Sequence, residues 1–368
     1  MILMETDRNS LLLPLGSTVG VVERRHTLPI LSNVLLEKKG QDMILQATDL
    51  ELQVSTKLSG TVADGDFALT VAARKFFDII RALPDGAKLQ LNGKDSLIEV
   101  KAGRSKFTLQ TLPAVDFPRM EASAASAAEV TLPQKAFKKI LQLVQFSMAQ
   151  QDIRYYLNGM LLVLEGKTLR VVATDGHRLA LAEATLEIDA GKRELIVPRK
   201  TVIELVKLLA DSDDPISLFL GESQVMFRLG DTQIVSKVVD GKFPDYQRVV
   251  PVGHEKKMAL NRQAGISALQ RAAILSNEKF RGVRLVLGAN SLRVVCNNNE
   301  QEEAQEELEA KYDSDPIDIG FNVSYLLDGL AALSSDEVIL AFHDPNSSVL
   351  LTSETEPGFK YVVMPMRI

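Results

Sequence analysis

Three short stretches of similar sequence recur along the chain: DMILQATD at residues 42–49, TLRVVATD at 168–175 and SLRVVCNN at 291–298. The second begins 126 residues after the first, and the third begins 123 residues after the second. Another apolar stretch precedes each of them, namely SNVLLE (32–37), NGMLLVLE (158–165) and RGVRLVLG (281–288). The turn within each pair reads GQD, GKT or GAN, which is typical of a β-hairpin. We therefore predict three copies of one β-hairpin.

Each predicted hairpin lies between two segments with helical periodicity. Apolar residues recur in these segments every three or four positions, as at Phe76, Ile80 and Leu83. The six segments are 8–20, 71–83, 133–149, 196–209, 261–276 and 321–333. The first is the weakest prediction, because Pro14 should kink or end a helix there.

The repeated order of helix, strands, helix and strands predicts three α+β domains, each with two helices and antiparallel sheets. Their predicted bounds are 1–122, 128–252 and 253–368, with linkers at 121–129 and 251–256. The repeat is longer than that of a solenoid protein, so it indicates duplicated domains.

The composition is that of a globular protein. Of the 368 residues, 46% are hydrophobic and 24% are charged, with a formal net charge of −6. Cys296, the single cysteine, excludes an internal disulfide, favours a reducing compartment and is expected to be an inert core residue. The four histidines show no zinc-site spacing, and no cofactor is expected. Because MILMETDRNS (1–10) does not resemble a signal peptide and no apolar run suits a membrane helix, we expect a cytoplasmic protein without a membrane partner.

Basic residues are unevenly distributed in this acidic chain. The net charge argues against binding of nucleic acid by overall charge alone. However, basic and amide residues gather on the polar faces of the predicted helices, at Lys135, Lys138, Lys139, Gln142, Arg74, Lys75, Arg81, Arg199, Lys200, Lys207, Arg262 and Arg271. A single such face is usually just a solvated surface. Its recurrence in repeated domains favours a shared surface that attracts phosphates without reading bases.

Motifs for catalysis are weak. GKT at 166–168 lacks the first glycine of a phosphate-binding loop, because Leu161 stands in its place. His177 next to Asp175 could act as a general base. However, Asp175 matches Asp49 of the first repeat, which favours a turn at a strand end or a place in the lining of a pocket.

The chain ends in YVVMPMRI (361–368), an apolar end where polar residues are usual. Such an end is either packed in the core or part of a groove for peptide binding. The pattern alone leaves both interpretations open.

Ten segments form an ordered signature over the whole chain: TLPIL (27–31), ARKFFDI (73–79), FSMAQQDIRYYLNGML (146–161), ATDGHRLA (173–180), VPRK (197–200), FPDY (243–246), AILSNEKFRGVRL (273–285), NNNEQEEAQEE (297–307), GFNVSYLLD (320–328) and YVVMPMR (361–367). Together they closely resemble the family of bacterial DNA polymerase III beta subunits, the sliding clamps. The resemblance implies a processivity factor without catalytic activity. It also implies that the three clamp domains form half of a six-domain ring, a head-to-tail homodimer around duplex DNA. A ring that holds DNA by topology is compatible with a net charge of −6.

The resemblance also implies three sets of site residues. Those implied for DNA contact are Arg25, Arg74, Arg104, Gln151, Tyr155, Tyr156, Arg199 and Lys200. Those implied for the dimer interface are Lys75, Lys106, Phe107 and Leu109 against Ile274, Leu275, Glu300, Glu302, Glu303 and Glu306. Those implied for a peptide-binding cleft are Leu157, Thr174, Gly176, His177, Arg178, Leu179, Pro244, Arg248, Val249, Ser348, Val362, Met364, Pro365, Met366 and Arg367, with Gln150 and Asn346 at its rim.

The implied partners are duplex DNA, a second copy of the chain and proteins with short linear motifs. Those proteins are the DNA polymerase III alpha subunit, clamp-loader subunits, translesion polymerases, and mismatch-repair and ligase proteins. The sequence also leaves two alternatives to a sliding clamp. One is a repeat protein that binds nucleic acid in an open basic groove, and the other is an enzyme that uses His177 and Asp175.

Overall fold

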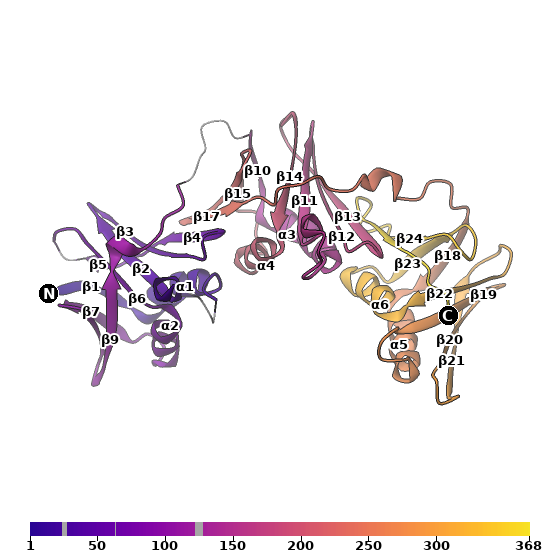
Figure 1. Ribbon diagram of the computed structural model, residues 1–368, viewed down its shortest axis with the longest axis horizontal. Coiled ribbons are helices and arrows are strands. Elements are labelled where there is room, and N and C mark those ends of the chain that lie inside the picture. Colours follow the sequence, from indigo (N-terminus) through magenta and orange to yellow (C-terminus); the bar gives the residue numbers. More distant parts are fainter. Residues whose placement is uncertain (24–27, 63, 122–127) are drawn as a thin grey trace. The chain divides into compact units, whose positions relative to one another are not determined.

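The computed structural model describes residues 1–23, 28–62, 64–121 and 128–368 (Figure 1). The chain forms two compact units, one of residues 1–134 and 203–238 and one of residues 135–202 and 239–368. The helices of the described residues are α1 (Arg8–Val19), α2 (Ala73–Ala82), α3 (Gln134–Val144), α4 (Arg199–Leu208), α5 (Arg262–Ala272) and α6 (Val323–Ala332). Each lies within one of the six segments predicted to be helical.

The first unit is built on a 13-stranded antiparallel sheet. Its strands are, in spatial order, β10 (Ala128–Pro133), β15 (Pro215–Leu220), β16 (Gln224–Leu229), β17 (Thr232–Lys237), β4 (Leu52–Lys57), β3 (Asp42–Thr48), β2 (Asn33–Lys39), β6 (Phe67–Ala72), β9 (Ser105–Pro113), β8 (Leu97–Ala102), β7 (Lys88–Lys94), β1 (Ile2–Asp7) and β5 (Thr61–Val62). Helix α1 packs against α2, β3 and β4, and Leu11, Leu15 and Phe76 are buried. The apolar periodicity of both helices therefore faces this core.

Helix α1 continues through Pro14, where the sequence predicted a kink or an end, so the helix does not end there. The proline removes the N–H that would bond to the carbonyl of Ser10, in the first turn of the helix. The side chain of Asp7 caps that turn by accepting a hydrogen bond from the Ser10 N–H at 3.0 Å. Burial of Leu11 and Leu15 on one face then offsets the missing hydrogen bond.

The three predicted hairpins are confirmed. β2 pairs with β3, β11 (Gly159–Glu165) with β12 (Thr168–Thr174), and β19 (Gly282–Gly288) with β20 (Ser291–Asn297). One side-chain oxygen after the second strand of each hairpin accepts two backbone N–H groups of the following turn. The side chains are those of Asp49, Asp175 and Asn298. Asp175 is thus a turn residue, as its match to Asp49 predicted.

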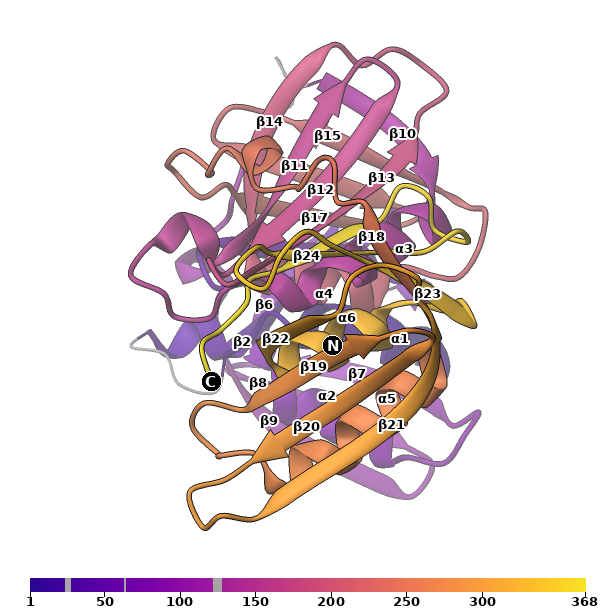
Figure 2. The ribbon, with the colours of Figure 1, turned by 90° about the vertical axis from the view of Figure 1, so that its right-hand side faces the viewer.

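The second unit is built on a 12-stranded antiparallel sheet. Its spatial order is β14 (Lys192–Pro198), β11, β12, β13 (Arg178–Thr185), β25 (Lys360–Val363), β24 (Val349–Thr352), β23 (Glu337–Phe342), β18 (Lys256–Asn261), β21 (Glu303–Lys311), β20, β19 and β22 (Ile317–Asn322). Helix α5 packs across β20 and β21 and also contacts α6 (Figure 2). Cys296 of β20 is buried, and burial raises the pKa of its thiol, so it is the core residue that was predicted.

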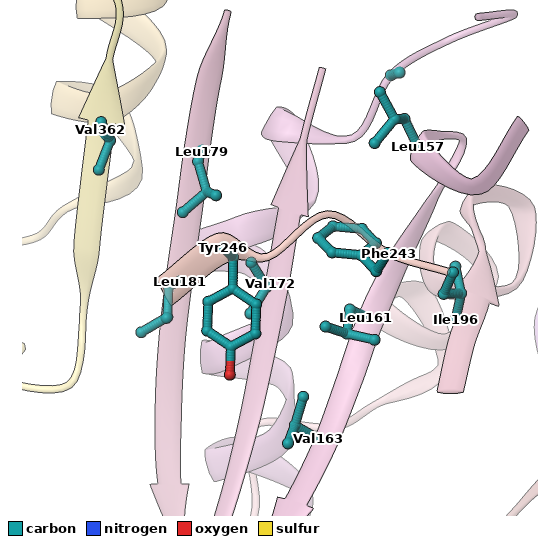
Figure 3. Close-up of a cluster of buried hydrophobic side chains, with 11 residues drawn as sticks. Leu157, Leu161, Val163, Val172, Leu179, Leu181, Ile196, Phe243, Tyr246 and Val362 are labelled. Carbon is teal, nitrogen blue, oxygen red and sulfur yellow. The ribbon is translucent and has the colours of Figure 1, made fainter. Parts of the chain in front are cut away.

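One face of β11, β12 and β13 carries an apolar cluster (Figure 3). The strand register places Leu161, Val172 and Leu181 in one row across the three strands. Segment 239–250 crosses this face and adds the buried side chains of Phe243 and Tyr246. The same face therefore holds both a sheet core and an irregular segment, and the candidate site lies beside them.

Candidate functional site

A cavity of about 210 Å³ borders the apolar cluster and shares Leu157, Leu179 and Val362 with it. The residues that line it are Arg154, Tyr156, Leu157, Thr174, Gly176, Arg178, Leu179, Pro244, Val249, Val362 and Met364. They come from segments far apart in the sequence that β13, β25 and segment 239–250 bring together. An apolar cavity with a few fixed polar groups suits the side chains of a short peptide.

Arg178 is the most highly connected polar residue of the site. Its Nε donates to Asp175 Oδ2 at 3.0 Å, and its Nη2 donates to the Phe146 carbonyl at 2.8 Å. Nη1 forms an ion pair with Asp328 of α6, and the guanidinium lies 4.5 Å from the centre of the Tyr325 ring. Although burial opposes its charge, these neighbours and Tyr361 raise the pKa of Arg178. The residue thus stays charged and links β13, α6 and the turn of residues 145–147 that follows α3.

The turn at one side of the cavity requires glycine. Gly176 has a φ of +89°, and a Cβ atom there would lie 2.9 Å from Nη1 of Arg154. Thr174 Oγ1 donates to the Arg178 carbonyl at 2.6 Å and accepts from the Gly176 N–H at 3.1 Å. Arg154 can therefore pass close to the turn, where its Nη2 donates to the Asp175 carbonyl at 3.1 Å.

A second, more polar cavity of about 390 Å³ adjoins Arg154 and Arg178. Its lining also includes Phe146, Met148, Ala149, Gln150, Asp152, Asp175, His177, Arg199 and Tyr325. The His177 ring stacks on Tyr325 with the ring centres 6.4 Å apart. Hydrogen bonds from Arg154 lower the pKa of Asp152 to about 2. Because Asp175 Oδ1 accepts the His177 main-chain N–H and its Oδ2 accepts from Arg178, the carboxylate serves the turn and the arginine.

The structure brings together only part of the predicted cleft. His177 and the rim residue Gln150 line the second cavity. The remaining predicted cleft and rim residues line neither cavity within the described chain: Arg248, Ser348, Pro365, Met366, Arg367 and Asn346. The Met364 N–H donates to the His177 carbonyl at 2.9 Å, and the Met366 N–H donates to the Gly320 carbonyl at 2.8 Å. The apolar chain end is thus both packed in the unit, at buried Val362, and part of a cavity, at Met364.

Sequence reasoning missed Arg154 and assigned Tyr156 to DNA contact, although both line the first cavity. Arg154 packs against the turn at Gly176, which is 22 residues away in the sequence, so local pattern gave no signal for its place in the cavity.

The residues predicted to contact DNA lie in both units. Arg25 lies outside the described residues. In the first unit Arg104 is exposed, and Nη2 of exposed Arg74 donates to the Val22 carbonyl at 2.7 Å. In the second unit Gln151 and Tyr155 are exposed, Tyr156, Arg199 and Lys200 are half-buried, and Nη1 of Arg199 donates to the Met148 carbonyl.

The residues predicted for the dimer interface lie at two strand edges and their neighbours. β9 carries Lys106, Phe107 and Leu109, with Lys75 exposed on α2, and Lys106 forms an ion pair with Glu99 of β8. β21 carries Glu303 and Glu306, preceded by exposed Glu300 and Glu302. Glu306 pairs with Arg271, and that hydrogen bond lowers the pKa of Glu306. Ile274 is 78% exposed, and Leu275 beside it is half-buried.

Two further properties concern the described residues only. Among them, no three His, Cys, Asp or Glu side chains gather as a metal site would require. The same part of the chain contains no helix that is both long and apolar enough to span a membrane.

Three family models match the chain in series. They describe the N-terminal, central and C-terminal domains of the DNA polymerase III beta subunit and match residues 3–121, 131–245 and 247–367. The chain belongs to the DNA polymerase III beta subunit family. This assignment confirms the predicted fold of three α+β clamp domains.

Relatives in this family are beta sliding clamps. That of Pseudomonas putida is 47% identical over 362 residues, which cover 98% of each chain. That of Escherichia coli K12 is 45% identical over 362 residues, covering 98% of this chain and 99% of the relative. A crystal structure of the Pseudomonas aeruginosa sliding clamp bound to griselimycin has a TM-score of 0.96 at 44% identity and covers all of both chains.

Membership in the DNA polymerase III beta subunit family also establishes the function. The protein is a DNA sliding clamp, a processivity factor of DNA replication and not an enzyme. Its partners are DNA and DNA polymerase III. The alternative of an enzyme that uses His177 and Asp175 is therefore wrong.

Proposed function

We propose that the 210 Å³ cavity is the centre of a peptide-binding cleft for the partners of the clamp. The partners are the DNA polymerase III alpha subunit, clamp-loader subunits, translesion polymerases, and mismatch-repair and ligase proteins. They compete for the cleft through short linear motifs. The observation that carries this proposal is the apolar cavity itself, with the aliphatic side chains of Leu179, Val362 and Met364 around rigidly held Arg178.

The cleft extends beyond this cavity in our proposal. His177, Arg248, Ser348, Pro365, Met366 and Arg367 contact the rest of the bound peptide. Most of the binding free energy comes from apolar anchors in the cavity, because fully desolvated contacts dominate interfaces of this kind. Gln150 and Asn346 at the rim contribute little.

Griselimycin, which is bound in a structure of the Pseudomonas aeruginosa clamp, provides a probe for the cleft. Met364 is 40% exposed, so its truncation should leave the fold intact while it removes cavity surface. We predict that Met364→Ala weakens griselimycin binding about tenfold in titration calorimetry. Val252→Ala, which removes a 92% exposed side chain of the same unit, is the control and should bind like wild type. Wild-type affinity in Met364→Ala would contradict the cleft.

We propose further that two chains close head to tail into a ring. β9 pairs with β8 over Ser105–Gln110 but with β6 only at Thr111–Pro113. β21 pairs with β20 over Glu303–Glu309 but with β18 only at Ala310 and Lys311. Each strand thus has an edge segment that, among the described residues, pairs on one side only. Exposed strand edges favour pairing with a strand of another chain. The positive charges of Lys75 and Lys106 on one chain complement the negative charges of Glu300, Glu302, Glu303 and Glu306 on the other.

The ring of two chains encloses duplex DNA in this proposal, and the domains that form it span 1–122, 128–252 and 253–368. Arg25, Arg74, Arg104, Gln151, Tyr155, Tyr156, Arg199 and Lys200 make weak contacts to the backbone. Weak contacts suffice because the closed ring retains the DNA and must still slide on it. We infer that the clamp works at replication forks in the cytoplasm.

A further inference from the structure

Segment 239–250 supplies one wall of the cavity through Pro244 and Val249. Tyr246 lies between these two residues and is the buried one, with 9% of its surface exposed. Its carbonyl accepts the N–H groups of Val249 at 3.0 Å and Val250 at 3.2 Å. The position of Val249 in the wall is therefore tied directly to the position of Tyr246.

The Tyr246 ring lies on the face of the sheet, and its hydroxyl contacts the charged side chain of Arg170. In Figure 3 the ring lies beside Leu181 and Val172, and its hydroxyl points toward Val163. The register partner of Val163 on β12 is Arg170, whose Nη1 donates to the Tyr246 hydroxyl at 3.0 Å. Arg170, Val172 and Thr174 alternate along β12 and so share this face. Thr174 lines the cavity, whereas Arg170 does not.

Arg170 is itself held in place. Its Nε donates to Glu183 Oε1 at 2.6 Å, and Glu183 is its register partner on β13. Glu165 of β11 lies 3.7 Å from Nη1, and only 18% of the Arg170 side chain is exposed. Although burial opposes the charge, the hydrogen bonds with Glu183 and Tyr246 raise the pKa of Arg170. The tyrosine hydroxyl therefore meets a donor fixed by neighbouring strands.

We propose that Arg170 is a positioning residue of the cleft, which fixes the Pro244–Val249 wall by hydrogen-bonding the Tyr246 hydroxyl. The assignment rests on the proposed cleft and adds a residue that does not touch the bound peptide. A wall held in its binding position needs no ordering when a ligand enters, so this hydrogen bond raises affinity by preorganisation. Without it, Tyr246 remains buried but can shift along the sheet, and Val249 shifts with it.

A double-mutant cycle tests the proposal. Tyr246→Phe removes only the hydroxyl, and Arg170→Gln removes the charged donor. We expect each variant to weaken griselimycin binding by about three- to tenfold, and the double variant by no more than either single change. The melting temperature of Tyr246→Phe should stay close to that of wild type, because its ring remains packed.

The matched control is Arg284→Gln, which removes another cross-strand arginine–carboxylate pair of the same unit. Nε of Arg284 donates to Asp318 Oδ1 at 3.1 Å on β22, away from segment 239–250. This variant should bind griselimycin like wild type. If Arg170→Gln does not fold, the griselimycin affinity of Tyr246→Phe alone tests the role of the hydrogen bond. Unchanged affinity in Tyr246→Phe, or losses that add in the double variant, would overturn the assignment.

The outcomes also separate this proposal from the proposed function. Wild-type protein that fails to bind griselimycin overturns the cleft and the role of Arg170 together. Wild-type binding that Met364→Ala weakens and Tyr246→Phe does not leaves the cleft intact and rejects only the role of Arg170.

Discussion

The carboxylate of Glu356 is buried in the second unit, where only 5% of the residue is exposed. It accepts hydrogen bonds from Ser334 Oγ at 2.6 Å and Ser353 Oγ at 2.8 Å, and Lys139 Nζ lies 3.5 Å away. Burial acts to raise the pKa of this carboxyl, but the hydroxyl hydrogen bonds and Lys139 lower it to about 2 from an ordinary 4.5. The ionised form thus stabilises the loop between β24 and β25 against α6 and α3.

This lowered pKa makes a prediction about acid stability. Because the folded-state pKa lies below the unfolded one, the stabilisation is complete above pH 4.5 and is lost as the pH falls toward 2. Between roughly pH 5 and pH 3, we predict that Glu356→Gln loses about 2 kcal/mol less unfolding free energy than wild type. Urea unfolding at the two pH values measures this difference. Exposed Glu354→Gln is the control and should behave like wild type, and an equally steep loss in Glu356→Gln would refute the assignment.

At the residue scale, sequence comparison within the chain predicts turns but not long-range contacts. Asp175 could be recognised as a turn residue because Asp49 repeats it. Glu356, Arg154 and Arg170 have no such signal, because their partners lie on other elements of the fold. The residues of the cavity come from segments that only the folded sheet brings together, so a family resemblance rather than local pattern pointed to all of them except Arg154 and Tyr156.

At the scale of elements, the hairpins and all six helical segments could be predicted from periodicity. The strand pairings that connect one repeat to the next could not be predicted in this way. β17 pairs with β4, and β13 pairs with β25, so each sheet continues from one repeat into another. These pairings depend on which strand edges meet, and neither strand of a pair carries a local signature of its partner. Pro14 shows the opposite case. Its local sequence predicted a kink or an end of the helix, but burial of Leu11 and Leu15 in the core stabilises α1 beyond this proline.

The edges of β9 and β21 predict the oligomeric state. Ile274 is 78% exposed beside Leu275 in the turn after α5, which suits an apolar contact at the centre of a charged interface. We predict that replacing both by alanine converts a dimer of about 81 kDa, twice the chain mass of 40.4 kDa, into a monomer. Light scattering gives the mass. Ile188→Ala, at a 57% exposed isoleucine elsewhere in the unit, should remain dimeric, and a dimeric double variant would rule out this seam.

At the scale of the whole molecule, the net charge of −6 was a poor guide to the partner. Acidic residues gather along β21 and the turn before it, where they serve the proposed seam. Exposed Arg74, Arg104 and Gln151 are available for DNA. A protein that held DNA by charge alone would need many strong phosphate contacts, which would make binding fall steeply with salt and impede sliding. The closed ring that we propose needs few such contacts, so topological binding is compatible with the acidic composition.

Retention on circular DNA distinguishes a closed ring from an open basic groove. After a clamp loader has placed the ring on a nicked circular duplex, we expect the ring to stay bound through gel filtration in high salt. Cutting the same circle once with a restriction enzyme should release it, because the ring slides off the ends. Equal retention on circular and linear DNA would contradict topological binding and favour the open basic groove instead.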